Sequence, residues 1–234
     1  MNPIRTFFIT ATGTGVGKTL VSAALCHQLL SRGISVQPFK PIISGYTEDH
    51  PENTDSGILL QSMGIKPCHE EVSRISPWRF TAPISPDMAA EKEGRRINFQ
   101  KLVQFSLNLP VEANTPNQHV NIIEGVGGAM VPLDDRHTVM DWMANLQADV
   151  LVVAGSYLGT ISHTLTTISA MNHRHIKPIG IVVSESQDSP VPVKLTTETI
   201  ARFLPEIPMA TIPRIIPSGA IWKDVPDLLK LLKL

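Results

Sequence analysis

The chain alternates short apolar runs with longer stretches of helical character. Runs that are apolar at consecutive positions are typical of strands buried on both faces. Six runs of strand length follow one another along the chain: Thr6–Thr10, Val36–Phe39, Val120–Ile123, Val150–Ala154, Ile179–Val183 and, as a sixth candidate, Met209–Ile212. We therefore expect these runs to form the strands of one buried sheet.

Helical stretches at Leu20–Leu30 and Ile161–Met171 follow the first and fourth predicted strands. Strands that alternate with helices are joined by right-handed crossovers and form a mostly parallel sheet. The sequence therefore predicts an α/β, three-layer fold of the P-loop NTPase type, with a single domain over residues 1–234. Residues 45–100 are rich in Pro, Asp, Glu and Ser, which predicts short helices and loops over the active edge, and Pro116–Gln118 is expected to end a helix.

Polar or glycine-rich segments follow the predicted strands, where each strand ends. In chain order they read ATGTGVGKT, KPIISG, EGVGG, GSYLGT and SES. Ligands of open parallel sheets bind outside the carboxyl ends of the strands. We therefore expect these segments to converge on one edge of the sheet.

The first of these segments, residues 11–19, has the features of a phosphate-binding loop between a strand and a helix. Its backbone N–H groups and the positive end of the helix would hold phosphates, and the tight bend needs glycines, which here are Gly13, Gly15 and Gly17. Lys18 adds a positive charge, and Thr19 offers a hydroxyl to Mg²⁺. Thr12 stands where the strict motif has glycine, so the loop is a variant.

Candidate chemistry also follows the second and third predicted strands. Glu124 comes directly after an apolar strand, where a carboxylate is costly unless it is paired or bound to a metal. Mg²⁺ binds one or two carboxylates together with phosphate oxygens and water, a demand that Glu124, Asp55 and Thr19 would meet. Lys40 and Ser44, after the second strand, suit an anionic group of a substrate.

A helix is predicted to begin at Gly159, Thr160, Ile161 and Ser162. Unpaired N–H groups at a helix start bind carboxylates, which makes this segment a candidate for substrate binding. An ordinary Thr or Ser helix cap would explain the same residues.

Composition excludes several classes of partner. The formal net charge of −1 and the scattered Lys and Arg residues give no attraction to nucleic acid or to an anionic membrane. No apolar run approaches the roughly 18 residues of a membrane span. Cys26 and Cys68 form no CxxC pair, which fits a reducing cytoplasmic compartment, and the eight histidines lack the spacing of metal ligands.

Taken together and in this order, these segments resemble the dethiobiotin synthetase family over nearly the whole chain. The resemblance rests on ATGTGVGKT at 11–19, KPIISG at 40–45, NTD at 53–55, PISP at 83–86, IEGVGGAMVPL at 123–133 and LGTISH at 158–163. It implies ATP-dependent closure of a ureido ring on 7,8-diaminononanoate (7,8-diaminopelargonate). CO2 forms a carbamate, which attacks the γ-phosphate to give a carbamic–phosphoric anhydride. The second amine then closes the ring, giving dethiobiotin, ADP and phosphate.

The resemblance also implies roles for single residues. Thr14 and Lys18 would hold the γ-phosphate, Lys40 would stabilise the carbamate and the developing charge, and Ser44 would bind the reacting end of the substrate. Three residues would hold Mg²⁺: Thr19, Asp55 and Glu124. The nucleotide is expected to contact Gly15, Val16, Gly17, Lys18, Thr19, Asp55, Glu124, Gly125, Val126, Gly127, Ser184, Glu185 and Pro213.

In this family the distant carboxylate of the substrate docks at a helix start of a second subunit. Carried over to residues 159–162, this implies a homodimer with active sites at its interface. The sequence departs from the family at Gly13 and Gly15, where acidic residues are common. It also has Ser184 and Glu185 where Asn-Asp often reads adenine, and serine has fewer hydrogen-bonding groups than an amide.

Three other interpretations are open. A partitioning-type P-loop ATPase, a dimeric switch protein, shares the fold, but its signature lysine would fall on Gly13. An amidotransferase-type synthase of cobalamin biosynthesis would add a glutaminase domain and a nucleophilic cysteine, which we do not expect in these 234 residues. A homologue that only binds nucleotide would not need Lys40, Asp55 and Glu124 together.

Overall fold

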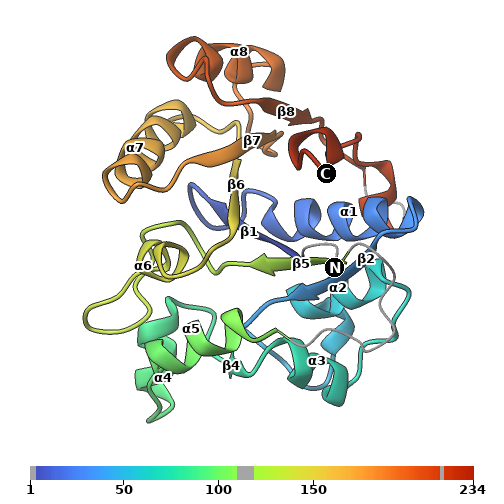
Figure 1. Cartoon of the computed structure of the whole chain (residues 1–234), viewed down its shortest axis with the longest axis vertical. Helices are drawn as coiled ribbons and strands as arrows, with labels where there is room; N and C mark the ends of the chain where they lie inside the picture. Colours follow the sequence, from blue (N-terminus) through green and yellow to red (C-terminus); the bar gives the residue numbers. More distant parts are fainter. Residues whose placement is uncertain (1–3, 110–118, 217–218) are drawn as a thin grey trace.

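Six parallel strands form the central sheet of the computed structural model, which describes residues 4–109, 119–216 and 219–234. The strand order is β2-β5-β1-β6-β7-β8, and every neighbouring pair is parallel (Figure 1). The strands are β1 (Arg5–Ala11), β2 (Ser35–Phe39), β5 (His119–Glu124), β6 (Asp149–Ala154), β7 (Pro178–Ser184) and β8 (Met209–Ile212). All six predicted strands and the parallel α/β fold are thus confirmed.

Helices cover both faces of this sheet. They are α1 (Lys18–Ser31), α2 (Asp55–Ser62), α3 (His69–Ile75), α4 (Pro86–Lys92), α5 (Phe99–Leu107), α6 (Val139–Ala144), α7 (Thr160–His173) and α8 (Val193–Phe203). The predicted helices after the first and fourth strands of the sequence are confirmed as α1 and α7. The helix end expected at Pro116–Gln118 lies outside the described residues.

The alternation of side chains along β1 explains why the middle of this strand, Phe7–Ile9, is apolar at consecutive positions. Phe7 and Ile9 pack on the face covered by α1 and the C-terminal segment, whereas Phe8 packs on the face covered by α6 and α7. Figure 1 shows α1 and α7 on opposite sides of the sheet. A strand buried on both faces needs apolar side chains at every position, so the continuous apolar runs follow from the three-layer arrangement.

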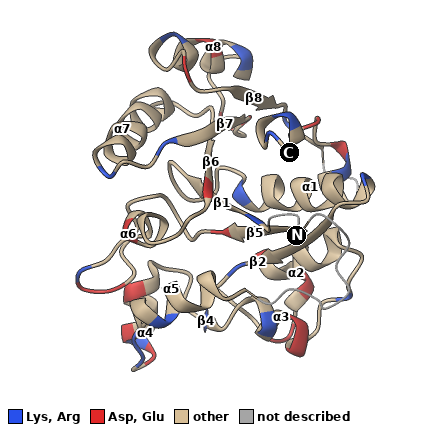
Figure 2. Cartoon of the chain, viewed as in Figure 1, with Lys and Arg blue, Asp and Glu red and all other residues tan. Residues whose placement is uncertain are grey.

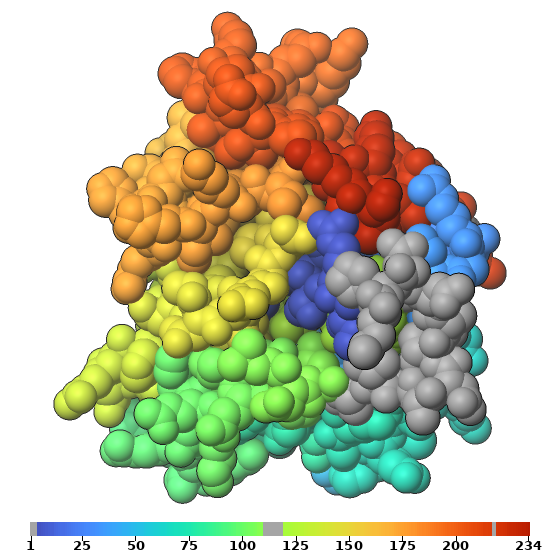
Figure 3. All heavy atoms as spheres, viewed as in Figure 1, coloured from blue at the N-terminus to red at the C-terminus, as the bar shows by residue number. Residues whose placement is uncertain are grey.

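The C-terminal segment completes the layer on the α1 side. The Gln28 side chain of α1 donates to the carbonyls of Val225 and Pro226, at 3.2 and 3.0 Å, and accepts from the Leu228 N–H at 2.9 Å. In the space-filling view of Figure 3, the red C-terminal residues lie against the blue end of α1. These bonds hold the last residues of the chain beside the first helix, so both cover the same face of the sheet.

A second, two-stranded parallel sheet stands beside the main one. It pairs β3 (Ile42–Ser44) with β4 (Trp78–Phe80), and backbone bonds from Gly45 to Ala82 extend the pairing. Ile42 and Phe80 of this pair join the main core that contains Phe8, whereas Ile43 belongs to a small apolar cluster with Phe39, Tyr46, Leu60, Val72 and Ile75. The short helices within residues 45–100 were predicted from the sequence, but these two strands were not. Each strand is only three residues long, and the two are far apart in the chain.

Charged residues of both signs are scattered along the chain, mostly in helices and loops, while few lie in the strands of the main sheet (Figure 2). This distribution fits the formal net charge of −1. Among the described residues, no helix combines the length and apolar character needed to cross a bilayer.

Replacing Trp142 by alanine is expected to destabilise the fold by about 3–5 kcal/mol, the usual cost of removing a large buried aromatic side chain. Trp142 is fully buried, stands edge-on to Phe8 at 4.8 Å between ring centroids, and donates to the Ser106 hydroxyl at 3.0 Å. Urea unfolding measures the change. The matched control is Leu195→Ala on the exposed side of α8, and equal losses in both variants would contradict this packing argument.

Candidate active site

The phosphate-binding loop joins β1 to α1 at the carboxyl edge of the sheet. The Thr12 N–H bonds to the Val153 carbonyl at 3.0 Å, which ties the start of the loop to β6. Gly15 and Gly17 have φ values of 74° and 100°, a region that side-chain-bearing residues rarely adopt. These two glycines therefore permit the turn that exposes backbone N–H groups ahead of α1.

Lys18 is the first residue of α1 and lines the cavity behind the loop. Its Nζ lies 3.4 Å from the Gly13 carbonyl. Burial and the charge of Lys40 lower the pKa of Lys18 to about 8, although Glu124 and Asp55 oppose this shift. Burial and a neighbouring cation disfavour the charged form of Lys18. The negative charge of a polyphosphate held by the loop N–H groups would stabilise the ammonium.

Glu124 is the last residue of β5 and is fully buried. The glycine-rich segment that follows it is fixed to β1: the Gly125 N–H donates to the Ile9 carbonyl and the Ala129 N–H to the Ala11 carbonyl, both at 2.9 Å. A Cβ on Gly128 would come within 3.2 Å of the Gly13 backbone. This segment therefore packs directly against the phosphate-binding loop.

Asp55 is the first residue of α2, and the local sequence holds it in place. The Thr54 side chain caps the helix by accepting from the Gly57 N–H at 3.1 Å, and its hydroxyl donates to the Pro51 carbonyl at 2.7 Å. A Cβ on Gly57 would stand 2.0 Å from that same carbonyl, so only glycine fits. The cap and the glycine together direct Asp55 toward the cavity.

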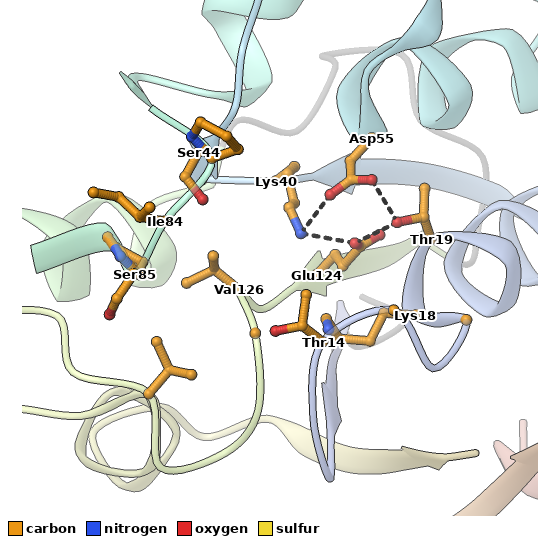
Figure 4. Close-up of a pocket in the computed structure, with 16 residues that line it drawn as sticks. Thr14, Lys18, Thr19, Lys40, Ser44, Asp55, Ile84, Ser85, Glu124 and Val126 are labelled. Atoms are coloured by element: carbon orange, nitrogen blue, oxygen red, sulfur yellow. Dashed lines mark hydrogen bonds and ion pairs between the residues drawn. The ribbon is translucent and has the colours of Figure 1, made fainter. Parts of the chain in front are cut away.

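A hydrogen-bonded network joins α1, α2, the end of β5 and the residue after β2 at this point (Figure 4). The Thr19 hydroxyl lies 2.9 Å from both Asp55 Oδ1 and Glu124 Oε1. The Lys40 Nζ lies 2.8 Å from Glu124 Oε1, 3.1 Å from Asp55 Oδ2 and 2.8 Å from the Gly125 carbonyl. Two carboxylates thus share one ammonium and one hydroxyl.

The charges of this network shift its pKa values in opposite directions. Burial alone would lower the pKa of Lys40, but the Glu124 and Asp55 carboxylates outweigh it and raise the pKa. The Lys40 ammonium lowers the pKa of Asp55, against the effect of burial. Both groups are therefore charged at neutral pH.

The network has more acceptors than donors. The Thr19 hydroxyl has one hydrogen and satisfies one carboxylate at a time. Glu124 Oε2 is buried and has no hydrogen-bond partner among the described residues. A buried carboxylate oxygen without a partner is costly, and two carboxylates beside a hydroxyl are the donors that Mg²⁺ prefers. The residues present therefore fit a magnesium ion held together with phosphate oxygens.

These groups line a cavity of about 610 Å³. Thr14, Gly15, Gly17, Lys18, Thr19, Lys40, Ser44, Asp55, Glu124, Val126 and Gly127 are the predicted site residues that it brings together. Figure 4 shows Ser44, Ile84 and Ser85 across the cavity from Lys18. Sequence reasoning gave no role to Ile84, Ser85 and Val131, which also line it, although the PISP motif at 83–86 was a signal.

The other predicted residues lie outside this cavity. Val16 is buried, and the Gly125 carbonyl accepts from Lys40. Ser184 ends β7 beside the phosphate-binding loop, where its Oγ would be 3.0 Å from a Cβ on Gly17. The Glu185 carboxylate accepts from the Arg214 N–H at 2.8 Å.

Two further predicted segments are also outside it. Pro213 follows β8, next to the residue that Glu185 binds. The four residues from Gly159 to Ser162 begin or precede α7, and none of them lines the cavity of its own chain.

Replacing Gly128 by alanine is expected to weaken nucleotide binding about tenfold, or about 1.4 kcal/mol, because the new Cβ would push on the backbone of the phosphate-binding loop. Calorimetric titration with the nucleotide measures the dissociation constant. Gly94→Ala is the control, since it adds strain at a φ of 63° with no close contact. It should lower the melting temperature without changing this constant, and unchanged binding by Gly128→Ala would contradict the proposed contact.

Solved structures with a similar arrangement confirm the P-loop fold. The cell division protein MinD of Aquifex aeolicus aligns with a TM-score of 0.53 at 14% identity, covering 89% of this chain and 82% of its own. The MinD cell division ATPase of Pyrococcus furiosus gives a TM-score of 0.51 at 17% identity, covering 91% and 84%. At these identities the likeness concerns the fold alone.

Sequence comparison is more specific. Residues 5–220 match the family described as an AAA domain. The ATP-dependent dethiobiotin synthetase BioD of Acidiphilium cryptum is 44% identical over 219 residues, which cover 93% of this chain and 96% of that protein. BioD of Methylobacterium nodulans is 40% identical over 202 residues, covering 85% and 89%. Because these proteins match it over nearly their whole length, the chain belongs to the ATP-dependent dethiobiotin synthetase family.

Proposed function

We propose that this protein forms dethiobiotin from 7,8-diaminononanoate, CO2 and ATP, with ADP and phosphate as the other products, as a step of biotin biosynthesis. The observation that carries the proposal is the junction of the phosphate-binding loop with Lys40, Asp55 and Glu124 in one cavity. The names of its relatives support the same activity.

The reaction needs an anionic nucleophile held in line with the γ-phosphate. A carbamate formed from CO2 and one amine supplies an oxygen that attacks the γ-phosphorus, and ADP leaves. The second amine then attacks the carbamate carbon, the ureido ring closes and phosphate leaves. Both steps depend on positioning and on neutralising charge more than on covalent catalysis.

The residues of the cavity match this demand. Thr14 and Lys18 hold the γ-phosphate as it moves, and the Lys40 ammonium stabilises the carbamate and the charge that develops on it. Ser44 binds the reacting end of the diamine. Ile84 and Val131 offer apolar surface to a methylene chain.

Thr19, Asp55 and Glu124 would hold magnesium. The bound ion would neutralise part of the phosphate charge. The support for this part of the proposal is the unpartnered Glu124 Oε2 beside a second carboxylate. Val16, Gly125, Ser184, Glu185 and Pro213 are proposed to contact the nucleotide outside the phosphate cavity.

A homodimer belongs to the same proposal. The distant carboxylate of the substrate would bind the α7 start, Gly159 to Ser162, of a second copy. Leu158, directly before this start, is 86% exposed, and Met130 on the glycine-rich segment is 58% exposed. Both side chains are exposed enough to be covered by a second copy in such a dimer. A cytoplasmic location completes the proposal and agrees with the unpaired cysteines Cys26 and Cys68.

The partitioning-type ATPase is not favoured. The MinD proteins share the fold at 14% and 17% identity, whereas the dethiobiotin synthetases share 39–44% over most of the chain. Gly13 stands where the signature lysine of that class would lie.

The activity is tested by incubating the protein with the diamine, bicarbonate, magnesium and ATP and measuring dethiobiotin by mass spectrometry. ADP release should depend on the diamine. ATP hydrolysis at the same rate with and without the diamine would rule out this function.

In the same assay, Lys40→Met should lower kcat about 10²–10³-fold, the usual loss when one group that stabilises developing charge is removed. Lys101→Met, on the exposed side of α5, removes an equal charge and should keep the wild-type rate. Full turnover by Lys40→Met would refute the role given to this lysine.

Leu158→Glu should convert the dimer to a monomer, because a charge would replace an apolar contact at the interface. Sedimentation velocity measures the assembly state. The monomer should keep its nucleotide affinity and show a raised KM for the diamine. Leu195→Glu, on the exposed face of α8, is the control. A wild-type protein that sediments as a monomer would refute the dimer.

A further inference from the structure

Lys40 has no free bonding capacity in this structure. Its ammonium has three hydrogens, and three acceptors surround it: Glu124 Oε1, Asp55 Oδ2 and the Gly125 carbonyl, at 2.8, 3.1 and 2.8 Å. The side chain is 3% exposed. Figure 4 shows the ammonium contacting the two carboxylates from the side opposite Thr19. A substrate anion could reach this ammonium only if one of these contacts opened.

The same two carboxylates are the proposed magnesium ligands. Oxygens that accept a hydrogen bond from an ammonium offer their lone pairs to it and are less available to a metal. Lys40 bonds to one oxygen of each carboxylate, and Glu124 Oε1 also accepts from Thr19. The lysine and a divalent cation therefore compete for one negatively charged site.

We propose that Lys40 acts as an internal counter-ion of the two carboxylates: its ammonium keeps Asp55 and Glu124 together until a divalent cation takes over their charge, and this exchange releases Lys40 for the substrate. The inference rests on the proposed function, because it uses the roles given there to Lys40 and the carboxylates.

The balance of charge supports an exchange rather than simple addition. Two carboxylates and the Lys40 ammonium sum to one negative charge, and Lys18 is the other cation that lines the cavity. A divalent cation that joined them with every Lys40 contact intact would crowd two cations on the same oxygens. Since like charges at such distances repel strongly in a buried site, the ammonium yields at least one carboxylate.

The exchange couples two binding events. Until the cation is bound, Lys40 is occupied by the carboxylates. Once it is bound, Lys40 is available in the cavity that Ser44 also lines. Carbamate stabilisation by Lys40 is then available only in an enzyme that already holds the divalent cation.

The test measures binding of Mn²⁺ alone by electron paramagnetic resonance, with neither nucleotide nor diamine present. Removing the competing ammonium in Lys40→Met should tighten Mn²⁺ binding by at least about tenfold relative to wild type. Lys18→Met is the matched control. It removes the same charge from the same cavity, but the Lys18 Nζ bonds to the Gly13 carbonyl and to no carboxylate among the described residues. It should change Mn²⁺ binding much less.

Equal tightening in both lysine variants would mean that the loss of any positive charge from the cavity strengthens Mn²⁺ binding, and it would overturn the proposal. Mn²⁺ binding by Lys40→Met that is no tighter than that of wild type would also overturn it. Added Mn²⁺ should raise the melting temperature of Lys40→Met more than that of wild type, because the metal replaces the lost counter-ion.

A measurement on the wild-type protein covers the case in which Lys40→Met does not fold. The side-chain ammonium signal of Lys40, in ¹⁵N-labelled protein, should be visible without metal and should shift when Mg²⁺ and a non-hydrolysable ATP analogue saturate the site. An unchanged signal at saturation would overturn the exchange. Because none of these experiments contains the diamine, their outcome is independent of whether ring closure is the reaction.

Discussion

The burial of Glu124 at the end of β5 is the constraint on which the site depends. A carboxylate without solvent needs cations and donors around it, and the neighbouring strands and helices supply them: Lys40 after β2, Thr19 on α1 and Asp55 on α2. The Thr54 cap of α2 holds Asp55 in this position. Among the described residues, Glu124 Oε2 has no hydrogen-bond partner, so the negative charge of the two carboxylates is only partly balanced.

Much of this arrangement follows from the sequence. Strands buried on both faces are apolar at most positions, which is why all six strands of the main sheet were predictable. Parallel strands place their following loops at one edge, so the convergence of Lys18, Lys40 and Glu124 was also predictable. Asp55 alone looks like a solvated acid, and only the cap and the resemblance to a family single it out.

Other features depend on contacts that no local pattern encodes. The strands β3 and β4 are three residues each and pair across a long stretch of chain, so neither produces a detectable periodicity. Ile84, after β4, and Val131, in the glycine-rich segment, line the same cavity although they are far apart in the chain. The three-way bonding of Lys40 likewise follows from tertiary structure, since its sequence context indicates only a lysine after a strand.

The similarity to MinD proteins shows how far the fold alone leads. One fold can serve proteins of different function, because function is set by the residues placed on it. In this chain the β3–β4 pair carries Ser44 into the cavity and leads into the PISP residues.

That pair is anchored in two places at once. Ile42 and Phe80 belong to the same core as Phe8 of β1, whereas Ile43 packs with Phe39 and Val72 in a small cluster of its own. The strand that carries Ser44 therefore shares its packing with the strand that leads into the phosphate-binding loop. A change of shape on the substrate side of the cavity would be transmitted through this shared core to the nucleotide side, so the two halves of the site are mechanically one unit.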